Sequence, residues 1–220
     1  MAYDYYRGKR AEQYNTRWRA YLQKTLAEGV SLIDFALLQR EKGSPAPRML
    51  DVACGTGIWL QCLLERIPSL QAYGIDGSEE MLAQARLALK QYPGVVFARG
   101  DLNGGEWAQA FLALEPFAVI TATNVLHDLS DPAHFLAELR ILLEPGGQLV
   151  LIDFAPHRPL WLWKAFEMVL QRVEQTPVRA LSISEAILAC KQAGFRLLDY
   201  KTFVVNWLWH GWALHLTRGT

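Results

Sequence analysis

The sequence is poor in cysteine, in long apolar runs and in targeting signals. Its three cysteines, Cys54, Cys62 and Cys190, are an odd number without the spacing of metal ligands. This usage is typical of a reducing compartment, so we expect a cytoplasmic protein without a metal site. No stretch approaches the roughly 18 uncharged apolar residues that a membrane span requires. The polar start, "MAYDYYRGKRAEQYN", does not resemble a signal peptide.

An excess of charge of either sign is also missing. Lys plus Arg and Asp plus Glu both number 22, so the formal net charge is zero. Because no dense basic run is present, we expect no nucleic-acid partner, and because no apolar run is long enough to span a bilayer, we expect no membrane partner. The 220 residues, 51% of them hydrophobic, are enough for one well-buried domain, as a monomer or a homodimer.

The first part of the chain has the pattern of helices. Apolar positions recur at helical spacing between residue 7 and about residue 41, which predicts two helices broken near Gly29. The prolines and glycine of "KGSPAP" (42–47) then stop helix formation. We therefore expect an N-terminal helical segment over residues 1–47, followed by a domain over residues 48–220.

From Arg48 to Phe154, short apolar runs alternate with helical stretches. This alternation is typical of a Rossmann-like, doubly wound α/β sheet whose strands are mostly parallel. The next stretch, about 155–195, predicts a small helical cap insertion. Two final strands, "RLLDYKTFVVNW" and "WALHLTRG", are expected around a turn at His210-Gly211, giving seven strands with the last one antiparallel.

Three acidic residues follow the first three predicted strands. Asp51 leads into the tight turn "CGTG", Asp76 ends the second strand and Asp101 ends the third. Open parallel sheets place their ligands at these carboxyl ends. Gly55 and Gly57 let the backbone approach a ligand closely. An acidic residue after the second strand is placed to bind both ribose hydroxyls, so the pattern indicates a nucleoside-like ligand.

The segments "LDVACGTG", "GIDGSEEMLAQAR", "ARGDL", "ITATNVLHDLSD" and "LEPGGQLVLIDF" resemble, in order and spacing, the class I S-adenosylmethionine-dependent methyltransferases. The resemblance covers about residues 48–155 and implies that S-adenosylmethionine is the cofactor. It places the methionine end by the glycine turn, the ribose on Asp76 and the adenine by Asp101. The cofactor residues that it implies are Asp51, Ala53, Cys54, Gly55, Gly57, Asp76, Gly77, Met81, Asp101, Leu102 and Asn124.

One departure from that family stands out, because Ala53 occupies the position of its usual first glycine. We expect a slightly altered turn and not a lost site. A nicotinamide-binding Rossmann domain is the nearest competitor, but it requires G-x-G-x-x-G, and the third glycine is missing here. A protein or RNA methyltransferase and a non-catalytic binding module of the same fold remain as alternatives.

The acceptor is expected to be a small aromatic or apolar molecule, since tryptophans gather on the loops that face the carboxyl ends of the strands. His127 is the candidate base, because its ordinary pKa suits proton transfer near neutral pH. An N-terminal segment rich in tyrosine is expected to form a lid. The predicted acceptor pocket comprises Tyr5, Tyr6, Tyr14, His127, Asp153, Trp161, Trp163, Trp207 and Trp209.

Overall fold

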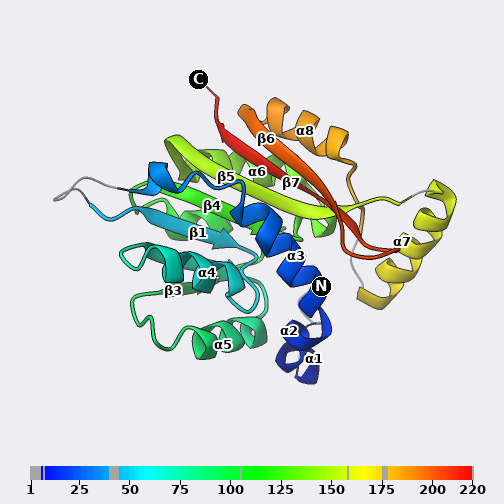
Figure 1. Ribbon diagram of the computed structural model, residues 1–220, viewed down its shortest axis with the longest axis horizontal. Coiled ribbons are helices and arrows are strands. Elements are labelled where there is room, and N and C mark those ends of the chain that lie inside the picture. Colours follow the sequence, from blue (N-terminus) through cyan, green and yellow to red (C-terminus); the bar gives the residue numbers. More distant parts are fainter. Residues whose placement is uncertain are drawn as a thin grey trace.

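The computed structural model describes residues 6, 8–39, 45–104, 106–157, 159–174 and 178–219. A twisted sheet of seven strands runs through the molecule, with helices on both of its faces (Figure 1). The strands are β1 (Arg48–Val52), β2 (Gln71–Asp76), β3 (Val96–Arg99), β4 (Phe117–Thr123), β5 (Leu143–Ala155), β6 (Phe195–Val204) and β7 (His210–Arg218).

Strand order confirms the predicted fold class. The order across the sheet is β3-β2-β1-β4-β5-β7-β6. Strands β1 to β5 pair in parallel, and β7 runs antiparallel to both β5 and β6. The order reverses between β1 and β4, so the carboxyl ends of these two strands form the crevice where such sheets bind ligands.

The described residues also form eight α-helices and three short 3₁₀ helices, the last of which is η4 (Leu126–Asp128). The others are α1 (Lys9–Glu12), α2 (Tyr14–Arg17), α3 (Arg19–Val30), η2 (Phe35–Leu38), α4 (Ile58–Arg66), α5 (Glu79–Ala88), η3 (Trp107–Phe111), α6 (Pro132–Leu142), α7 (Leu160–Glu174) and α8 (Ile183–Gln192). Helices α6 and α8 each begin with a side-chain cap. Asp131 Oδ1 accepts from the His134 amide before α6, and Ser182 with Glu185 forms a capping box before α8.

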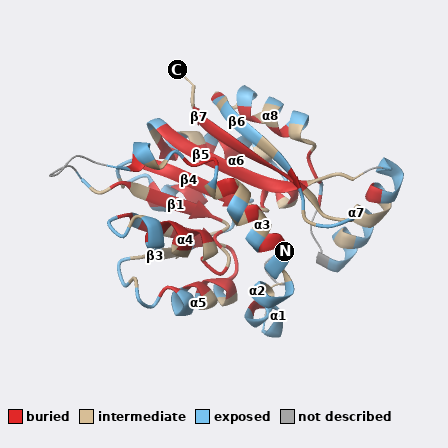
Figure 2. Cartoon of the chain, in the orientation of Figure 1, coloured by how far each residue is buried: buried red, intermediate tan, exposed pale blue. Residues whose placement is uncertain are grey.

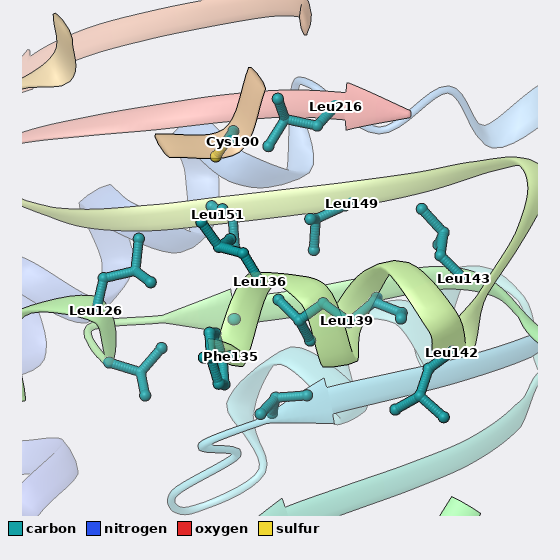
Figure 3. Close-up of a cluster of buried hydrophobic side chains, with 14 of the residues drawn as sticks. Leu126, Phe135, Leu136, Leu139, Leu142, Leu143, Leu149, Leu151, Cys190 and Leu216 are labelled. Carbon is teal, nitrogen blue, oxygen red and sulfur yellow. The ribbon is translucent and has the colours of Figure 1, made fainter. Parts of the chain in front are cut away.

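The apolar core lies in two layers, one on each face of the sheet. One layer packs η3, α6 and α8 on the strands, and Figure 3 shows its leucine-rich centre around Leu136 and Leu139 of α6. The other layer packs α4, α5 and the segment from Leu32 to Leu38 on the opposite face. Because both faces are covered, the central strands β1, β4 and β5 are buried over most of their length and do not alternate between buried and exposed residues.

The helix break predicted near Gly29 is present, since α3 ends at Val30, and one later boundary differs from the sequence prediction. A Cβ on Gly29 would overlap the side chains of Ile152 and Trp59. The glycine therefore serves close packing of α3 on the sheet. The final turn lies at 205–209, before His210 and not around it, since Val205 N donates to Trp209 O at 2.9 Å.

Candidate functional site

The turn between β1 and α4 has an unusual backbone. Ala53, Gly55 and Gly57 all have positive φ, at 59°, 52° and 78°. Glycine adopts this left-handed region freely, whereas Ala53 carries the strain that its Cβ imposes. The sharp turn predicted after Asp51 is thus present with alanine at its first position. It brings the backbone of Gly55 to the carboxyl edge of the sheet.

Asp76, at the end of β2, holds this turn in place. Its Oδ2 accepts from the Gly55 amide at 2.8 Å, and its Oδ1 accepts from the Ser78 amide at 2.9 Å. Burial raises the pKa of the carboxyl, and the backbone donors of Ser78, Gly55 and Gly77 oppose that rise. Each carboxylate oxygen keeps a second lone pair, so the group can also accept from a ligand hydroxyl.

Asp51 is buried, and one of its two carboxylate oxygens has a hydrogen-bond partner. Thr121 Oγ1 donates to its Oδ1 at 2.6 Å, while Oδ2 has no hydrogen-bond partner within the described chain. Burial raises the pKa of this carboxyl to about 7. Thr123 Oγ1 is likewise buried without a partner in the described chain, and both residues line one pocket beside the glycine turn. A ligand group that donates hydrogen bonds, such as an ammonium, fits these atoms.

A second pocket continues from that turn along the carboxyl ends of β2 and β4. It is lined by Tyr6, Tyr14, Ala53, Gly55, Asp76, Gly77, Met81, Leu102, Asn103, Thr123, Asn124, Val125, Asp128 and Leu129. We call this cavity the donor pocket. Of the residues predicted for the cofactor, it brings together Ala53, Gly55, Asp76, Gly77, Met81, Leu102 and Asn124.

The remaining predicted cofactor residues lie around the donor pocket. Asp51 and Cys54 line the adjoining cavity behind the glycine turn. Gly57 is the N-cap of α4, where a Cβ would press on Leu89. Asp101 is exposed, and its Oδ1 accepts from the Asn103 amide at 3.0 Å. Sequence reasoning missed Asn103 and Thr123, which are direct neighbours of predicted residues.

An aromatic pocket opens beside the donor pocket. It is lined by Tyr6, Tyr14, Trp18, Tyr21, Asn124, His127, Phe154, Leu170 and Trp209. Trp209 is its centre, because its ring contacts those of Trp18 at 5.6 Å, Tyr21 at 6.0 Å and Phe154 at 5.5 Å. These edge-on arrangements are the favoured geometry for aromatic pairs. We call this cavity the acceptor pocket.

The acceptor pocket contains only part of the predicted set. Tyr6, Tyr14, His127 and Trp209 line it, and Tyr5 lies outside the described residues. Asp153 and Trp163 are buried behind the lining, where they contact His127 and Trp209. Trp161 and Trp207 lie outside the pocket, contrary to the prediction, because 69% and 82% of their surfaces are exposed. Sequence reasoning did not assign four lining residues, Trp18, Tyr21, Phe154 and Leu170.

His127 is tied firmly to Asp153 below the acceptor pocket. Its Nδ1 lies 2.7 Å from Asp153 Oδ1, and its backbone amide donates to Asp153 Oδ2 at 3.1 Å. The Phe154 amide also donates to Oδ1, at 2.8 Å, so three donors converge on a carboxylate that is 1% exposed. Because a carboxylate only accepts, Nδ1 of His127 carries a proton toward Asp153, while Nε2 lies 3.4 Å from Asp128 Oδ2.

The two pockets meet at three shared residues, Tyr6, Tyr14 and Asn124. Asn124 has φ of 56°, another strained position, and its Oδ1 accepts from the Tyr21 hydroxyl at 2.8 Å. Burial raises the pKa of Tyr21 well above its usual range, which keeps the hydroxyl protonated. This hydrogen bond therefore fixes the side chain of Asn124 at the place where the two pockets meet.

The N-terminal helices cross the mouth of both pockets. Asn15 Oδ1 accepts from Thr56 Oγ1 at 2.7 Å, and Ser78 Oγ donates to the Tyr6 carbonyl at 3.2 Å. These bonds connect the helices to the glycine turn and to the start of α5. The arrangement is that of a cover over the site, and its movement as a lid stays a prediction.

Comparison with known proteins adds an independent line of evidence. Residues 50–149 match the model of a methyltransferase domain. The trans-aconitate 2-methyltransferase of Acidovorax sp. (strain JS42) is 40% identical over 108 residues, which are 49% of this chain and 38% of that protein. The malonyl-[acyl-carrier protein] O-methyltransferase of Paenibacillus sp. (strain JDR-2) is 27% identical over 184 residues, 80% of this chain and 64% of that protein. The chain thus spans less than two thirds of the length of these relatives.

Solved structures share the fold over nearly the whole chain. An O-methyltransferase family 2 protein from Planctomyces limnophilus, in complex with apigenin, gives a TM-score of 0.71 at 20% identity and covers 94% of this chain and 60% of its own. Magnesium protoporphyrin IX methyltransferase from Synechocystis PCC 6803 gives 0.70 at 17% identity, covering 99% and 98%. The strand order and the glycine turn with its two carboxylates agree with these comparisons: residues 50–149 form a methyltransferase domain, and the chain has the fold of the class I S-adenosylmethionine-dependent methyltransferases.

Proposed function

We propose that this protein transfers a methyl group from S-adenosylmethionine to a hydroxyl group of a small aromatic molecule. The observation that carries the proposal is the direct junction of the donor and acceptor pockets at Tyr6, Tyr14 and Asn124. Two ligands that meet at this junction would be held in one orientation. Such alignment accounts for much of the rate enhancement of a bimolecular reaction.

The donor pocket fits S-adenosylmethionine on the chemistry of its lining. Asp76 would accept from the ribose hydroxyls, and Leu102 with Asn103 would lie beside the adenine. The unpartnered Oδ2 of Asp51 and the Thr123 hydroxyl would meet the polar end of the methionine moiety. When bound, S-adenosylmethionine supplies a methyl group on a positively charged sulfur, open to in-line attack by a nucleophile.

The acceptor pocket supports an aromatic acceptor without a carboxylate. Six of its lining residues are aromatic rings of Tyr, Trp or Phe, which bury flat apolar surface well. Among its described lining residues there is neither Lys nor Arg to pair with a carboxylate. The acids named for its relatives, trans-aconitate and a malonyl group, would therefore lack a cationic partner here.

His127 is proposed as the general base. With Nδ1–H donated to Asp153, its Nε2 can take the proton of an acceptor hydroxyl as the oxygen forms its new bond to carbon. The resulting imidazolium would lie between two carboxylates, since Asp128 Oδ2 is 3.4 Å from Nε2. Asp153 would act as a positioning residue that fixes the tautomer of His127.

Binding and turnover test the proposal separately. Calorimetry should detect binding of S-adenosylhomocysteine, and Asp76→Ala should weaken it at least tenfold by removing the ribose acceptor. An absence of binding to the unaltered protein would contradict the assignment of the donor pocket.

Turnover is then measured as release of S-adenosylhomocysteine with matched pairs of phenols and benzoates. We expect activity with phenols and none with the corresponding carboxylates. His127→Gln should lower kcat by about 10²- to 10⁴-fold while S-adenosylhomocysteine still binds. His134→Gln, whose side chain is 53% exposed on α6, serves as the control. Activity with benzoates alone would refute the proposed acceptor class.

A further inference from the structure

Helix α7 forms one wall of the acceptor pocket through its inner face. Trp163 and Phe166 pack against Trp209, with ring centroids 6.4 Å and 5.6 Å apart, and Leu170 lines the pocket itself. Figure 1 shows that α7 stands at the end of the molecule, away from the helices that cover the sheet. Only its inner face is therefore occupied by the rest of the described chain.

The outer face of α7 is apolar and uncovered. Figure 2 shows most of the helix as exposed, and this surface carries large side chains. At 3.6 residues per turn they occupy an arc of about 140° around the helix axis. Their exposed fractions are Trp161 69%, Met168 61%, Val169 57%, Val173 52% and Leu162 50%. Arg172 lies within the same arc and Lys164 about 40° beyond its edge, so the basic groups are set among the apolar side chains. An exposed surface with this many large apolar side chains is typical of an interaction site.

The basic and acidic side chains of α7 differ in where they point. Lys164 and Arg172 are exposed. Glu167 is turned inward, where its Oε1 accepts from Trp163 Nε1 at 2.8 Å and from the Ala180 amide at 2.9 Å. Among the described side chains of α7 the exposed charges are the two positive ones, and Glu174 ends the helix, so the middle of this face favours a partner of negative charge.

A second exposed tryptophan lies close to this helix. Trp207, 82% exposed, belongs to the turn at 205–209, and that turn packs on α7 through Trp209. Tryptophans gather at the boundary between lipid and water, where the ring is partly buried and the indole N–H stays hydrated.

We infer that the outer face of α7 docks the protein on an anionic lipid surface. An amphipathic helix with Trp and Leu on one face and basic residues beside it lies in the plane of such an interface. A second copy of the chain is a poorer partner. A two-fold contact through this face would bring Lys164 and Arg172 toward their own copies, whereas Glu167, the acidic group among the described side chains of α7, is turned inward.

Docking by α7 would replace the expectation, drawn from the sequence, that the protein has no membrane partner. Among the described residues, no helix has both the length and the apolar content to cross a bilayer, in line with the lack of a long apolar run. The sequence therefore suggested no membrane partner. A surface helix needs no such run, because it enters only the headgroup region. With Leu170 on its inner side, α7 would hold the acceptor pocket against lipid, where an apolar acceptor would dissolve.

Sedimentation with vesicles tests this inference on the full chain. We expect binding to phosphatidylcholine vesicles that contain about a quarter phosphatidylglycerol, and much weaker binding to pure phosphatidylcholine. Lys164→Ala and Arg172→Ala should each lower the partition coefficient about fivefold. The double variant Leu162→Glu/Val169→Glu should abolish binding. Leu87→Glu, at a position 63% exposed on α5, is the matched control and should bind as the unaltered protein does.

Several results would overturn the inference. Equal binding to neutral and anionic vesicles would remove the role of Lys164 and Arg172. No vesicle binding, together with a dimer in analytical ultracentrifugation that Leu162→Glu/Val169→Glu splits, would assign the face to a second copy. Binding of S-adenosylhomocysteine, measured on the same samples, shows whether each variant is folded. Because that binding belongs to the donor pocket, failure to dock leaves the proposed methyl transfer untouched.

Discussion

The imidazole of His127 and the carboxylate of Asp153, 26 residues apart in the chain, lie 2.7 Å from each other beneath the acceptor pocket. His127 is 8% exposed and Asp153 is 1% exposed, so water competes little for their hydrogen bond. The pair connects the short η4 turn after β4 to the end of β5. A buried acid thereby sets the orientation of the ring that the pocket presents to its ligand.

Asp153→Asn tests that relationship. The amide keeps the shape of the carboxylate but loses the charge that stabilises a protonated His127, so we expect kcat to fall by about 10²- to 10⁴-fold. The pH dependence of kcat should shift toward lower pH, because an imidazole without its carboxylate is harder to protonate and so reaches its basic form at lower pH; this shift identifies a positioning role. Binding of S-adenosylhomocysteine should stay within twofold. A variant with unaltered kcat would remove Asp153 from the reaction.

Asp51 predicts a dependence of stability on pH. Burial raises the pKa of its carboxyl from 3.8 to about 7 in the folded chain. An acid whose folded pKa is raised contributes stability at low pH and loses it as the pH rises from about 4 through about 7. Urea denaturation should therefore show a loss of about 1.4 kcal/mol between roughly pH 6 and pH 8 from this group.

The control is Asp51→Asn, which keeps an oxygen for the Thr121 hydroxyl and removes the titrating group. Subtracting its pH profile isolates Asp51 from Asp76, whose pKa burial also raises. A difference that is flat across this range would mean that Asp51 ionises in the folded chain as it does in the unfolded one.

Trp209→Leu should separate acceptor binding from donor binding. The ring of Trp209 contacts Trp18, Tyr21 and Phe154, so its loss opens the acceptor pocket and should raise KM for a phenol at least tenfold. Affinity for S-adenosylhomocysteine should change less than twofold. Trp207→Leu, two residues away and 82% exposed, should change neither quantity with a water-soluble acceptor. Equal effects of the two variants would contradict the proposed pocket.

Gly29→Ala tests the packing of α3 on the sheet. Alanine favours helix by about 1 kcal/mol over glycine. The new Cβ would overlap Ile152 and Trp59, and such overpacking costs about 1–3 kcal/mol. We expect net destabilisation in urea denaturation. Gly94→Ala, where a Cβ meets nothing within 4 Å, should change the free energy of unfolding by less than about 0.5 kcal/mol. A more stable Gly29→Ala protein would show that α3 can move away from the sheet.

The donor side of the site was predictable because its signals are local. Gly55, Gly57 and Asp76 act through turns that their own neighbours form, and parallel strands bring their carboxyl ends to one edge. Ala53 departs from the family pattern, yet it holds the same left-handed conformation as the glycines beside it. The predicted turn therefore forms despite this substitution, because its shape depends on the backbone angles of a few adjacent residues.

The acceptor side depends on contacts between distant segments, which a single sequence does not specify. Helical spacing predicts a helix around Trp18 and Tyr21, which are the N-cap and a residue of α3, but it does not say which surface that helix meets. Trp161 and Trp163 differ for a simpler reason. Residues i and i+2 of a helix are about 200° apart around its axis, so the rings of Trp161 and Trp163 cannot face one pocket. Trp163 is 3% exposed and Trp161 is 69% exposed.

The two hydrogen bonds of Asp76 limit which parts of the site can be changed to alter substrate preference. The same carboxylate that would hold the ribose also fixes the amides of Gly55 and Ser78, so a substitution that alters nucleoside preference would also release two turns. Much of the acceptor pocket lies away from those turns, because Trp18, Leu170 and Trp209 come from the start of α3, from α7 and from the turn at 205–209. Engineering a new substrate should therefore begin at Trp18, Leu170 and Trp209, where exchange leaves the architecture of the nucleoside site intact.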